Sequence, residues 1–353
     1  MENILLLTNE LNRSSGWATV GYYLNEELGK VYNTTVVSHI KDSNNNYNLI
    51  STYNYYNIFK LFSDYNSILK KIGNKKFDLI ICNIEPFLPL AVKLKRYFKS
   101  KLVLIGHGTY IYYPFVKIPF KYYNKFFIKY VDKIIVPSRY TYNKVKEWFK
   151  GDNLTIINWG VDTKRYYPKR VEKELAFIFV GAQKERKGVI YLLKAFKEVL
   201  QEYPDVKLYM VGKKSKKYYK YIKNNKLDKN IFFHENATHD ELLYYYSKSM
   251  VHVLPSVNTN NAFEGFGLVH LEANACGIPS IGTLNTANEE IIIDGYNGFL
   301  VPQRDVNQLY SRLKLILEDK DMWKKMCKNS LKYAKEHTWE KTAKKFIEII
   351  EEL

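Results

Sequence analysis

Residues 264–277 read Glu264-Gly-Phe-Gly-Leu-Val-His-Leu-Glu272-Ala-Asn-Ala-Cys-Gly277. Gly265-Phe-Gly267 breaks the chain before this segment, residues 268–275 have the apolar spacing of a helix, and Gly277 ends it. Two carboxylates thus border or lie on one short helix, although residues 251–300 contain no Lys or Arg. Because no cation is near them in the sequence, we expect these carboxylates to hold something that comes from outside the chain.

The start of this predicted helix suits a phosphate. Its free N–H groups, around Phe266, Gly267 and Leu268, form an anion site. Carboxylates on either side, Glu264 and Glu272, can accept hydrogen bonds from hydroxyl groups of ribose or of a sugar. A phosphate between hydroxyl-bearing groups describes a nucleotide sugar. The alternative is a capped helix with two solvated acids, which the spacing alone does not exclude.

Short apolar runs alternate with helical segments along the whole chain, which predicts parallel sheets covered on both faces. The chain order is interrupted at residues 158–168 (NWGVDTKRYYP), which indicates two α/β units of similar size. Open parallel sheets bind ligands outside the carboxyl ends of their strands, so the expected site is a cleft between the units. Residues 42–57 are rich in Asn and Tyr and are expected to form a surface excursion. The predicted strands are residues 4–8, 34–38, 79–82, 102–105, 133–137, 175–180, 206–211, 231–233, 251–254 and a run around 279–281.

The composition is that of an ordinary globular protein with a strong basic excess. The 353 residues are long for one core, and 54 Lys and Arg face 36 Asp and Glu, for a formal charge of +18. Residues 51–150 hold nineteen of the basic residues and five acidic ones. Such a field attracts phosphate on nucleic acid, lipid headgroups or a nucleotide. A general Lys-rich usage that keeps the protein soluble explains it equally well.

Cysteine usage and the apolar runs indicate a cytoplasmic protein. Cys82, Cys276 and Cys327 are odd in number and far apart, which disfavours a disulfide framework and a zinc site. No apolar run is long enough to span a bilayer, and the first residues do not resemble a secretory signal. Six of the seven histidines have no ligand partners at metal spacing and are expected to be structural. They are His39, His234, His239, His252, His270 and His337.

The stretch EGFGLVHLEANACGIPSI, with Glu264 and Glu272 separated by seven residues, resembles the donor-site motif of retaining glycosyltransferases of family 4, which have the GT-B fold. The resemblance covers the C-terminal half almost continuously and the N-terminal half loosely, chiefly through His107-Gly108 and the loop at Gly16. The other matching segments are Asn158-Trp-Gly-Val-Asp162, Phe179-Val-Gly181 through Lys187-Gly188, Leu254-Pro-Ser256, Glu290 to Gly298, and Trp339.

The resemblance implies an α/β protein of the GT-B class, with two Rossmann-like doubly wound parallel-sheet domains facing across a cleft. The expected domains are residues 1–162 for the acceptor and residues 163–335 for the nucleotide sugar. A C-terminal helix at residues 336–353 is expected to pack back on the first domain.

The resemblance also implies roles for individual donor-site residues. Glu272 holds the ribose hydroxyls, and Glu264 touches hydroxyls of the transferred sugar near the reacting carbon. Lys187 neutralises the leaving diphosphate, together with the amides of Phe266, Gly267 and Leu268. Gly181 belongs to the loop that grips the phosphates.

Two further residues come from the N-terminal half. His107 contacts the donor sugar beside the anomeric centre, and Gly16 lets the first loop approach the phosphates. His107, Glu264 and Lys187 are therefore the expected catalytic residues. Since a Lys and a helix terminus supply the charge neutralisation, we expect no metal and no cofactor beside the donor substrate.

The sequence departs from the family's pattern at one phosphate contact. Many members have an Arg directly after the glycine that matches Gly181, whereas this chain has Ala182. Arg186 or Lys184 can replace that contact, and we favour Arg186. The implied reaction retains the anomeric configuration, with the departing phosphate as base; Glu264 as a covalent nucleophile is the less favoured version.

Five lysines recur at every fourth residue in KIPFKYYNKFFIKYVDK, and they predict a basic helix face opposite an aromatic face that includes Phe126. Pro119 suits the first turn of this helix. The lysines are either solvated or contact an anionic membrane, which favours a lipid-linked acceptor glycan and peripheral membrane association. A protein or nucleic acid acceptor, or a protein that binds nucleotide sugars without catalysis, is the alternative, and nucleic acid is the less favoured partner. The lysines are Lys117, Lys121, Lys125, Lys129 and Lys133.

Overall fold

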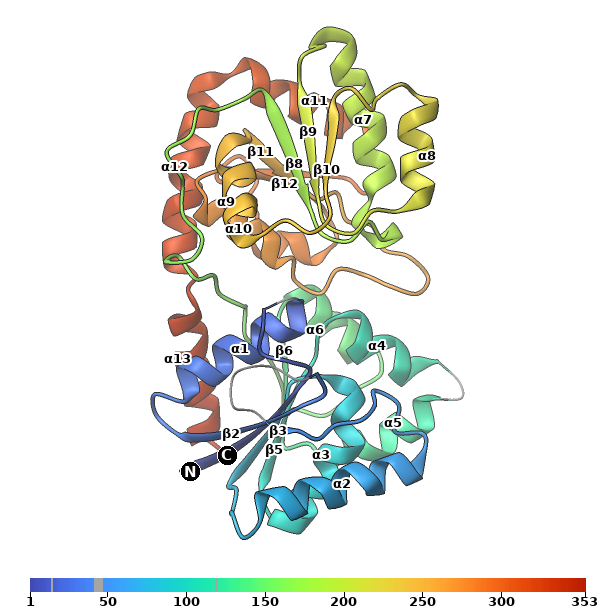
Figure 1. Cartoon of the computed structure of the whole chain (residues 1–353), viewed down its shortest axis with the longest axis vertical. Coiled ribbons are helices and arrows are strands. Elements are labelled where there is room, and N and C mark those ends of the chain that lie inside the picture. Colours follow the sequence, from blue (N-terminus) through green and yellow to red (C-terminus); the bar gives the residue numbers. More distant parts are fainter. Residues whose placement is uncertain (14, 41–46, 118–119) are drawn as a thin grey trace. The chain divides into compact units, whose positions relative to one another are not determined.

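The computed structural model describes residues 1–13, 15–40, 47–117 and 120–353. The chain forms two compact units (Figure 1). The first contains Met1–Trp159 and Trp339–Leu353, and the second contains Gly160–Thr338. Each unit is built on one parallel sheet with helices on both faces, which confirms the predicted pair of Rossmann-like domains.

The sheet of the first unit has seven parallel strands in the order β3-β2-β1-β4-β5-β6-β7. Its central strands are mostly apolar because helices cover both faces. The strands are β1 (Asn3–Thr8), β2 (Asn33–Ser38), β3 (Tyr47–Asn48), β4 (Leu79–Cys82), β5 (Lys101–Ile105), β6 (Lys133–Val136) and β7 (Leu154–Ile156).

Helices α1 and α13 contact each other on the first unit, although they come from opposite ends of the chain (Figure 1). Trp339, the first residue of α13, stacks on Tyr23 of α1 with ring centroids 4.9 Å apart, and its other neighbour is Trp159 at 6.3 Å. The helices of this unit are α1 (Gly16–Leu28), α2 (Ile58–Ile72), η1 (Glu85–Phe87), α3 (Leu88–Phe98), α4 (Thr109–Val116), α5 (Phe120–Ile128), α6 (Arg139–Lys146) and α13 (Trp339–Glu351).

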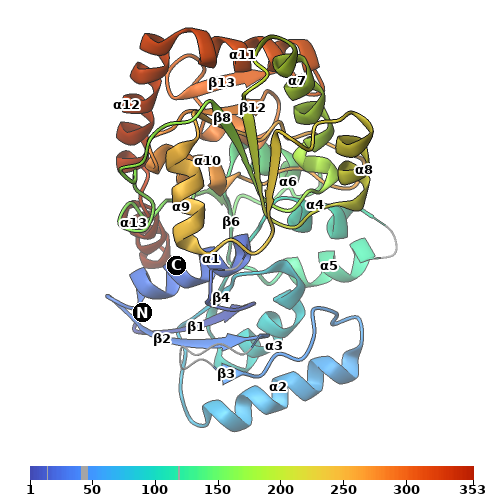
Figure 2. The same ribbon diagram turned by 45° about the horizontal axis from the view of Figure 1, so that its top comes forward.

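The sheet of the second unit has six parallel strands in the order β10-β9-β8-β11-β12-β13. Figure 2 shows α9, α10 and α12 on one side of this sheet and α7 and α8 on the other. The strands are β8 (Ala176–Val180), β9 (Lys207–Val211), β10 (Ile231–His234), β11 (Val251–Val253), β12 (Ser280–Thr283) and β13 (Gly298–Val301). The helices are η2 (Glu185–Lys187), α7 (Val189–Glu202), α8 (Lys216–Asn224), α9 (His239–Lys248), α10 (Leu268–Ala275), η3 (Ala287–Glu290), α11 (Val306–Glu318) and α12 (Lys320–Glu336).

Central strand β8 shows why its sequence is a continuous apolar run. Phe177 and Phe179 belong to the core under α7 and α11, whereas Ile178 and Val180 pack against α9 and α10 on the other face. Every side chain of the strand is buried. The carboxyl end of β8 leads directly into the segment that carries Lys187.

Two local predictions are wrong. Residues 47–57 are not a surface excursion, since β3 joins the sheet edge and Ile50 and Tyr55 are each 2% exposed; residues 42–46 lie outside the described part. The predicted basic helix over residues 117–133 is shortened to α5, because Lys117 follows the end of α4, Lys129 follows the end of α5 and Lys133 begins strand β6. Phe126, predicted to be buried, is 50% exposed. Pro119 lies outside the described residues.

Within the part of the chain that the structure describes, none of the helices has both the length and the apolar character needed to cross a membrane.

Candidate active site

The turn η2 carries two cations just beyond the carboxyl end of β8. Arg186 and Lys187 are its last residues, and Gly188 follows them in a left-handed conformation with φ of 65°. A Cβ atom on Gly188 would lie 1.7 Å from the carbonyl oxygen of Pro255. Only glycine therefore fits this close approach of two backbones, and the approach holds the turn against the segment after β11.

Helix α10 begins without a side-chain cap among the described residues. Its N-cap, Gly267, has φ of 93°, and no side chain accepts a hydrogen bond from the first turn. A Cβ on Gly267 would meet Cδ2 of His270 at 3.0 Å, so the left-handed turn and the packing both favour glycine. The N–H groups of an uncapped first turn and the helix dipole give this end a partial positive charge.

Glu264 joins the two segments through ion pairs. Its Oε2 atom lies 2.6 Å from Nη1 of Arg186 and 2.6 Å from Nζ of Lys187. Burial opposes ionisation of Glu264, but the charges of Arg186 and Lys187 outweigh it and lower the pKa of Glu264 to about 2. Burial and the neighbouring Arg186 lower the pKa of Lys187, against the opposing effect of Glu264. Two cations on one anion leave one net positive charge.

The two ion pairs correct the expectation that Glu264 lacks a cation. Its cations come from η2, a turn distant in the sequence that the fold places beside it. Arg186, favoured as the replacement for the contact missing at Ala182, reaches this cluster, whereas Lys184 is exposed.

Glu272 lies inside α10, half-buried and near two tyrosines. The hydroxyl of Tyr246 donates to its Oε2 at 3.3 Å, and Tyr166 also interacts with it. Burial raises the pKa of Glu272, while Tyr166, Tyr246 and the charges of Arg165 and Lys187 act in the opposite direction. Neither the tyrosines nor Arg165 stood out in the sequence, because they come from α9 and from the segment that enters the second unit.

Two histidines expected to be structural support the start of α10. Nδ1 of His252 and Nδ1 of His270 lie 3.2 Å apart, and Nε2 of His270 contacts the side-chain amide of Asn288 at 2.8 Å. Burial lowers the pKa of His270 to about 3 and that of His252 well below its ordinary value. Both rings are therefore neutral at neutral pH, and they position α10 through packing and hydrogen bonds.

His107 follows β5 in the first unit. Its Nε2 lies 2.6 Å from the carbonyl oxygen of Asn83 and donates to it, which leaves Nδ1 as the acceptor nitrogen. Burial lowers the pKa of His107 to about 4, so its ring is neutral at physiological pH. The rings of Trp17 and Trp159 lie 6.4 and 6.0 Å from it.

Gly16 was expected in a loop, but it is the first residue of α1. The N-cap is Ser15, whose Oγ accepts from the backbone N–H of Ala18 at 3.2 Å. Nothing lies within 4 Å of a Cβ built on Gly16, so the surroundings of this residue do not themselves require glycine.

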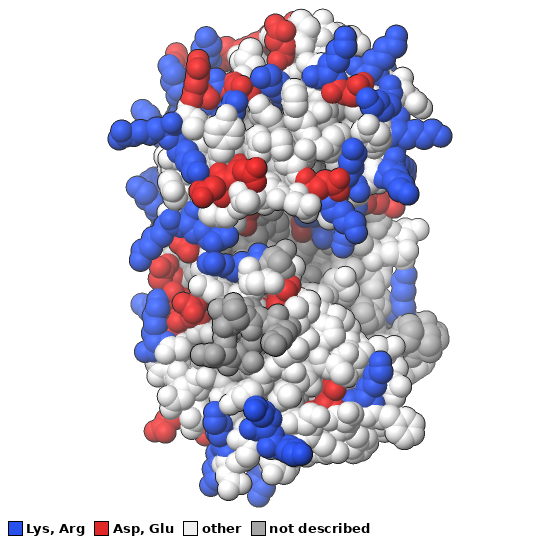
Figure 3. All heavy atoms as spheres, viewed as in Figure 1, with Lys and Arg blue, Asp and Glu red and all other residues white. Residues whose placement is uncertain are grey.

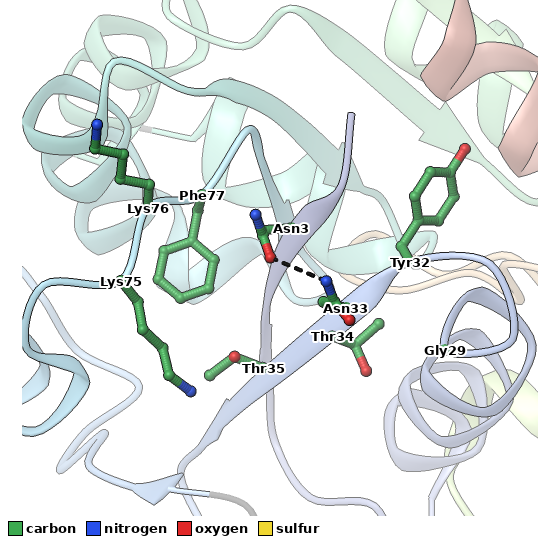
Figure 4. Close-up of a pocket in the computed structure, with 9 residues that line it drawn as sticks. All are labelled: Asn3, Gly29, Tyr32, Asn33, Thr34, Thr35, Lys75, Lys76 and Phe77. Atoms are coloured by element: carbon green, nitrogen blue, oxygen red, sulfur yellow. Dashed lines mark hydrogen bonds between the residues drawn. The ribbon is translucent and has the colours of Figure 1, made fainter.

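A hollow lies in the first unit at the amino ends of β1 and β2, the edge of the sheet opposite to the one that His107 follows (Figure 4). It has a volume of about 510 Å³. Asn33 donates to Asn3 across it at 3.3 Å, and Lys75 reaches toward Thr35 while Lys76 points away. Parallel sheets bind ligands at the carboxyl ends of their strands, so this hollow is not part of the candidate site.

Comparison with known proteins points to the same class of fold as the two parallel-sheet units. The model of the glycosyl transferases group 1 matches residues 162–337, and that of glycosyltransferase family 4 matches residues 16–165. Together the two models match residues 16–337, and the chain has the fold of GT-B glycosyltransferases.

Individual relatives support the same assignment. An uncharacterised glycosyltransferase of Methanocaldococcus jannaschii is 32% identical over 65% of this chain, and the match spans 63% of that relative. Sucrose-phosphate synthase from Thermosynechococcus elongatus has the same fold, with a TM-score of 0.84 and 20% identity over 100% of this chain and 99% of that one. Anabaena HepE in complex with UDP-glucose gives a TM-score of 0.83 at 15% identity and covers both chains fully.

Proposed function

We propose that this protein is a retaining glycosyltransferase of the family 4 type, which moves a sugar from a nucleoside-diphosphate sugar to an acceptor hydroxyl. The observation that carries the proposal is the cluster of Arg186, Lys187 and Glu264 in the same unit as the uncapped start of α10. This cluster has a net positive charge and is largely buried, which suits the diphosphate of a donor. HepE, a protein of the same fold, has been solved with UDP-glucose bound.

The chemistry follows from where charge develops. The bond between the anomeric carbon and the phosphate oxygen breaks, and the nucleoside diphosphate leaves with the electron pair. The acceptor oxygen forms the new bond on the same face, and its proton passes to the departing phosphate. Lys187, Arg186 and the N–H groups at Phe266, Gly267 and Leu268 stabilise the leaving negative charge, with no metal or other cofactor in the proposal.

The remaining residues bind and orient the donor. Glu272 accepts from the ribose hydroxyls, and Gly181, with φ of 132° at the end of β8, belongs to the loop that grips the phosphates. In the proposal Glu264 exchanges part of its ion pairing for hydroxyls of the transferred sugar. His107 is neutral and presents Nδ1 as an acceptor, which suits a sugar hydroxyl beside the anomeric centre.

The proposed acceptor is inferred from the surface of the first unit. Lys117 and Lys129 are exposed beside α5, where Tyr122 is 68% and Phe126 50% exposed, and Phe59 on α2 is 83% exposed. Exposed aromatic rings beside lysines suit the interface of an anionic membrane. On the face of this unit seen in Figure 3, Lys and Arg side chains lie at the lower end and along the margins, and most of the remaining coloured surface carries no charge. We therefore propose a lipid-linked acceptor glycan at the cytoplasmic face of a membrane.

The proposal is tested by incubating the protein with a panel of UDP-, GDP-, ADP- and CMP-sugars and measuring release of the nucleotide. One diphosphate family should be turned over, and the new glycosidic bond or the released sugar should first appear with the donor's anomeric configuration by NMR. Glu264→Ala should abolish turnover while Glu185→Ala, on the exposed side of the same turn, retains it. Binding of a nucleotide sugar without release by the wild type would identify a non-catalytic binding protein instead.

A further inference from the structure

A second pocket lies in the first unit, at the carboxyl edge of its sheet. It has a volume of about 70 Å³, and its lining is almost entirely aromatic rings and prolines. Tyr53, Tyr56 and Tyr110 form an open rim and are between 38% and 43% exposed, whereas Tyr55 and Phe115 are almost fully buried. The pocket is therefore open to solvent at one end and apolar inside.

One carboxyl group, that of Glu85, is among the described residues that line this pocket. Glu85 follows β4 and is 4% exposed. Its Oε1 accepts from the backbone N–H of His107 at 2.5 Å, but its Oε2 is buried and has no hydrogen-bond partner among the described residues. A buried polar atom left without a partner costs about 1–3 kcal/mol, so a group that satisfies it gains this hydrogen bond on binding.

We propose that this pocket binds the acetamido group of an acceptor sugar. The methyl group enters among the tyrosine rings and prolines, and the amide bonds with the free Oε2 of Glu85. An amide carries both a donor and an acceptor, so it satisfies the carboxyl in either protonation state. Burial raises the pKa of Glu85 to about 8, which means that both states are populated near neutral pH.

The size of the pocket selects the group. A cavity of about 150 Å³ holds a benzene molecule of six carbon atoms, so about 70 Å³ holds roughly three heavy atoms. An acetyl group has three heavy atoms, so it fits this volume. A whole sugar ring is too large to enter, but its apolar face can rest on the exposed tyrosines of the rim.

The inference rests on the proposed function, because it names the class of acceptor. The pocket adjoins His107 through the hydrogen bond between its backbone N–H and Glu85, and both residues follow neighbouring strands, β4 and β5. The carboxyl edge of a parallel sheet is where ligands of such units bind. An acetamido sugar held here lies beside the same histidine that the proposal assigns to the transferred sugar.

The test needs no donor. Saturation-transfer NMR on the full chain would compare methyl β-N-acetylglucosaminide with methyl β-glucoside, which differ only at the acetamido position. The acetyl methyl protons of the first should receive the strongest saturation, and its affinity should exceed that of the glucoside about tenfold, the size of one hydrogen bond to a buried group.

Variants at one position separate recognition from folding. Glu85→Met retains length but loses the hydrogen bonds, so its affinity for the acetamido sugar should fall about tenfold, while Glu85→Gln should remain within about threefold. Glu26→Met, at an exposed position of α1, should behave as the wild type. Equal binding of the two sugars, an unchanged affinity in Glu85→Met, or no acetyl signal from a folded wild-type protein would overturn the inference. Nucleotide binding in the second unit is measured separately, so its failure would count against the proposed function and not against this pocket.

Discussion

Nζ of Lys187 lies 2.6 Å from Oε2 of Glu264, so the cation assigned to the donor's diphosphate is neutralised by a carboxylate. Arg186 contacts the same oxygen and keeps the cluster positive by one charge. Both buried cations are thus paired with the carboxylate of Glu264. A diphosphate carries more negative charge and is expected to bind them more strongly than this carboxylate does. Under the proposed function, donor binding exchanges ion pairs within this cluster.

Removal of the shared carboxylate tests this exchange. Glu264→Ala leaves Arg186 and Lys187 without their anion, which should lower the free energy of unfolding by about 1–3 kcal/mol. The same variant should gain more thermal stability from a nucleoside diphosphate than the wild type does, while turnover falls at least about a hundredfold. Differential scanning fluorimetry and nucleotide release measure the two effects. A smaller gain from the diphosphate in the variant would show that Glu264 does not compete with phosphate.

Glu272 should report on the ribose. If its carboxylate holds ribose hydroxyls, Glu272→Ala should weaken binding of the preferred nucleoside diphosphate about tenfold. The 2′-deoxy nucleotide should bind the wild type more weakly and should be nearly insensitive to the substitution, because the shared hydrogen bond is already lost. Isothermal titration of both nucleotides with both proteins gives the coupling. Equal losses for the two nucleotides would place Glu272 away from the ribose.

The glycine that follows the cationic turn should not tolerate a side chain. A Cβ on Gly188 would lie 1.7 Å from the carbonyl oxygen of Pro255, at a φ of 65°. Gly188→Ala should therefore destabilise the protein by more than about 3 kcal/mol, measured by urea unfolding. Gly16→Ala is the matched control, because nothing lies within 4 Å of its Cβ, and it should not change stability. A loss of donor turnover in a stable Gly16→Ala protein would support the role in phosphate approach that the resemblance implies.

Stability should fall as the pH rises above neutrality because of one buried acid. Burial raises the pKa of Glu85 from its ordinary 4.5 to about 8. The folded state holds this proton more tightly than the unfolded chain, so the contribution of the neutral acid is complete below pH 4.5 and is lost as the pH rises through 8. Glu85→Gln should flatten the decline in the free energy of unfolding between about pH 6.5 and 8.5.

The free energies of unfolding of the wild type and Glu85→Gln should be compared above pH 6.5. Below this pH the buried histidines change the stability in the opposite direction. Burial lowers the pKa of His107 to about 4 and of His270 to about 3, so their contribution is lost on acidification. Parallel curves for the wild type and Glu85→Gln above pH 6.5 would contradict the raised pKa of Glu85.

Membrane attachment, if the proposed acceptor is correct, should depend on the lysines on and beside α5. Replacing Lys121, Lys125 and Lys129 by Glu should greatly reduce cosedimentation with vesicles that contain anionic lipid, and salt should weaken binding of the wild type. The control replaces three exposed lysines of α12, Lys324, Lys325 and Lys328, by Glu, with the same change in net charge. If both triple variants lost cosedimentation equally, the binding would depend on net charge and not on the lysines of α5.

The architecture was largely predictable because the central strands are unbroken apolar runs, as in residues 4–8 and 176–180. Strands β3, β7 and β13 were not predicted: β3 has two residues, too few for a pattern, and β7 and β13 contain Thr155 and Gly298, so neither is a continuous apolar run. The basic helix was misplaced since a spacing of four persists in the sequence through Lys133, where the chain has already entered β6.

Some features of the candidate site were likewise predictable from the sequence, and others were not. Glu264, Glu272 and Lys187 carry a local motif, so sequence found them. The ion pairs of Glu264 depend on two loops that the sheet brings together, so no local sequence pattern predicts these ion pairs. Glu85 stands between Ile84 and Pro86 in no recognisable motif. Its burial, and an oxygen that has no hydrogen-bond partner in the described part of the chain, identify it.

Thermal stabilisation by nucleotides tests the donor site most directly, because a ligand that binds only the folded state raises its stability. The wild type should be stabilised more by the diphosphate of one nucleoside than by its monophosphate. This increment should vanish in Lys187→Ala and persist in Lys184→Ala, whose side chain is exposed. An equal increment in Lys187→Ala and the wild type, or no stabilisation by any nucleotide, would contradict the account.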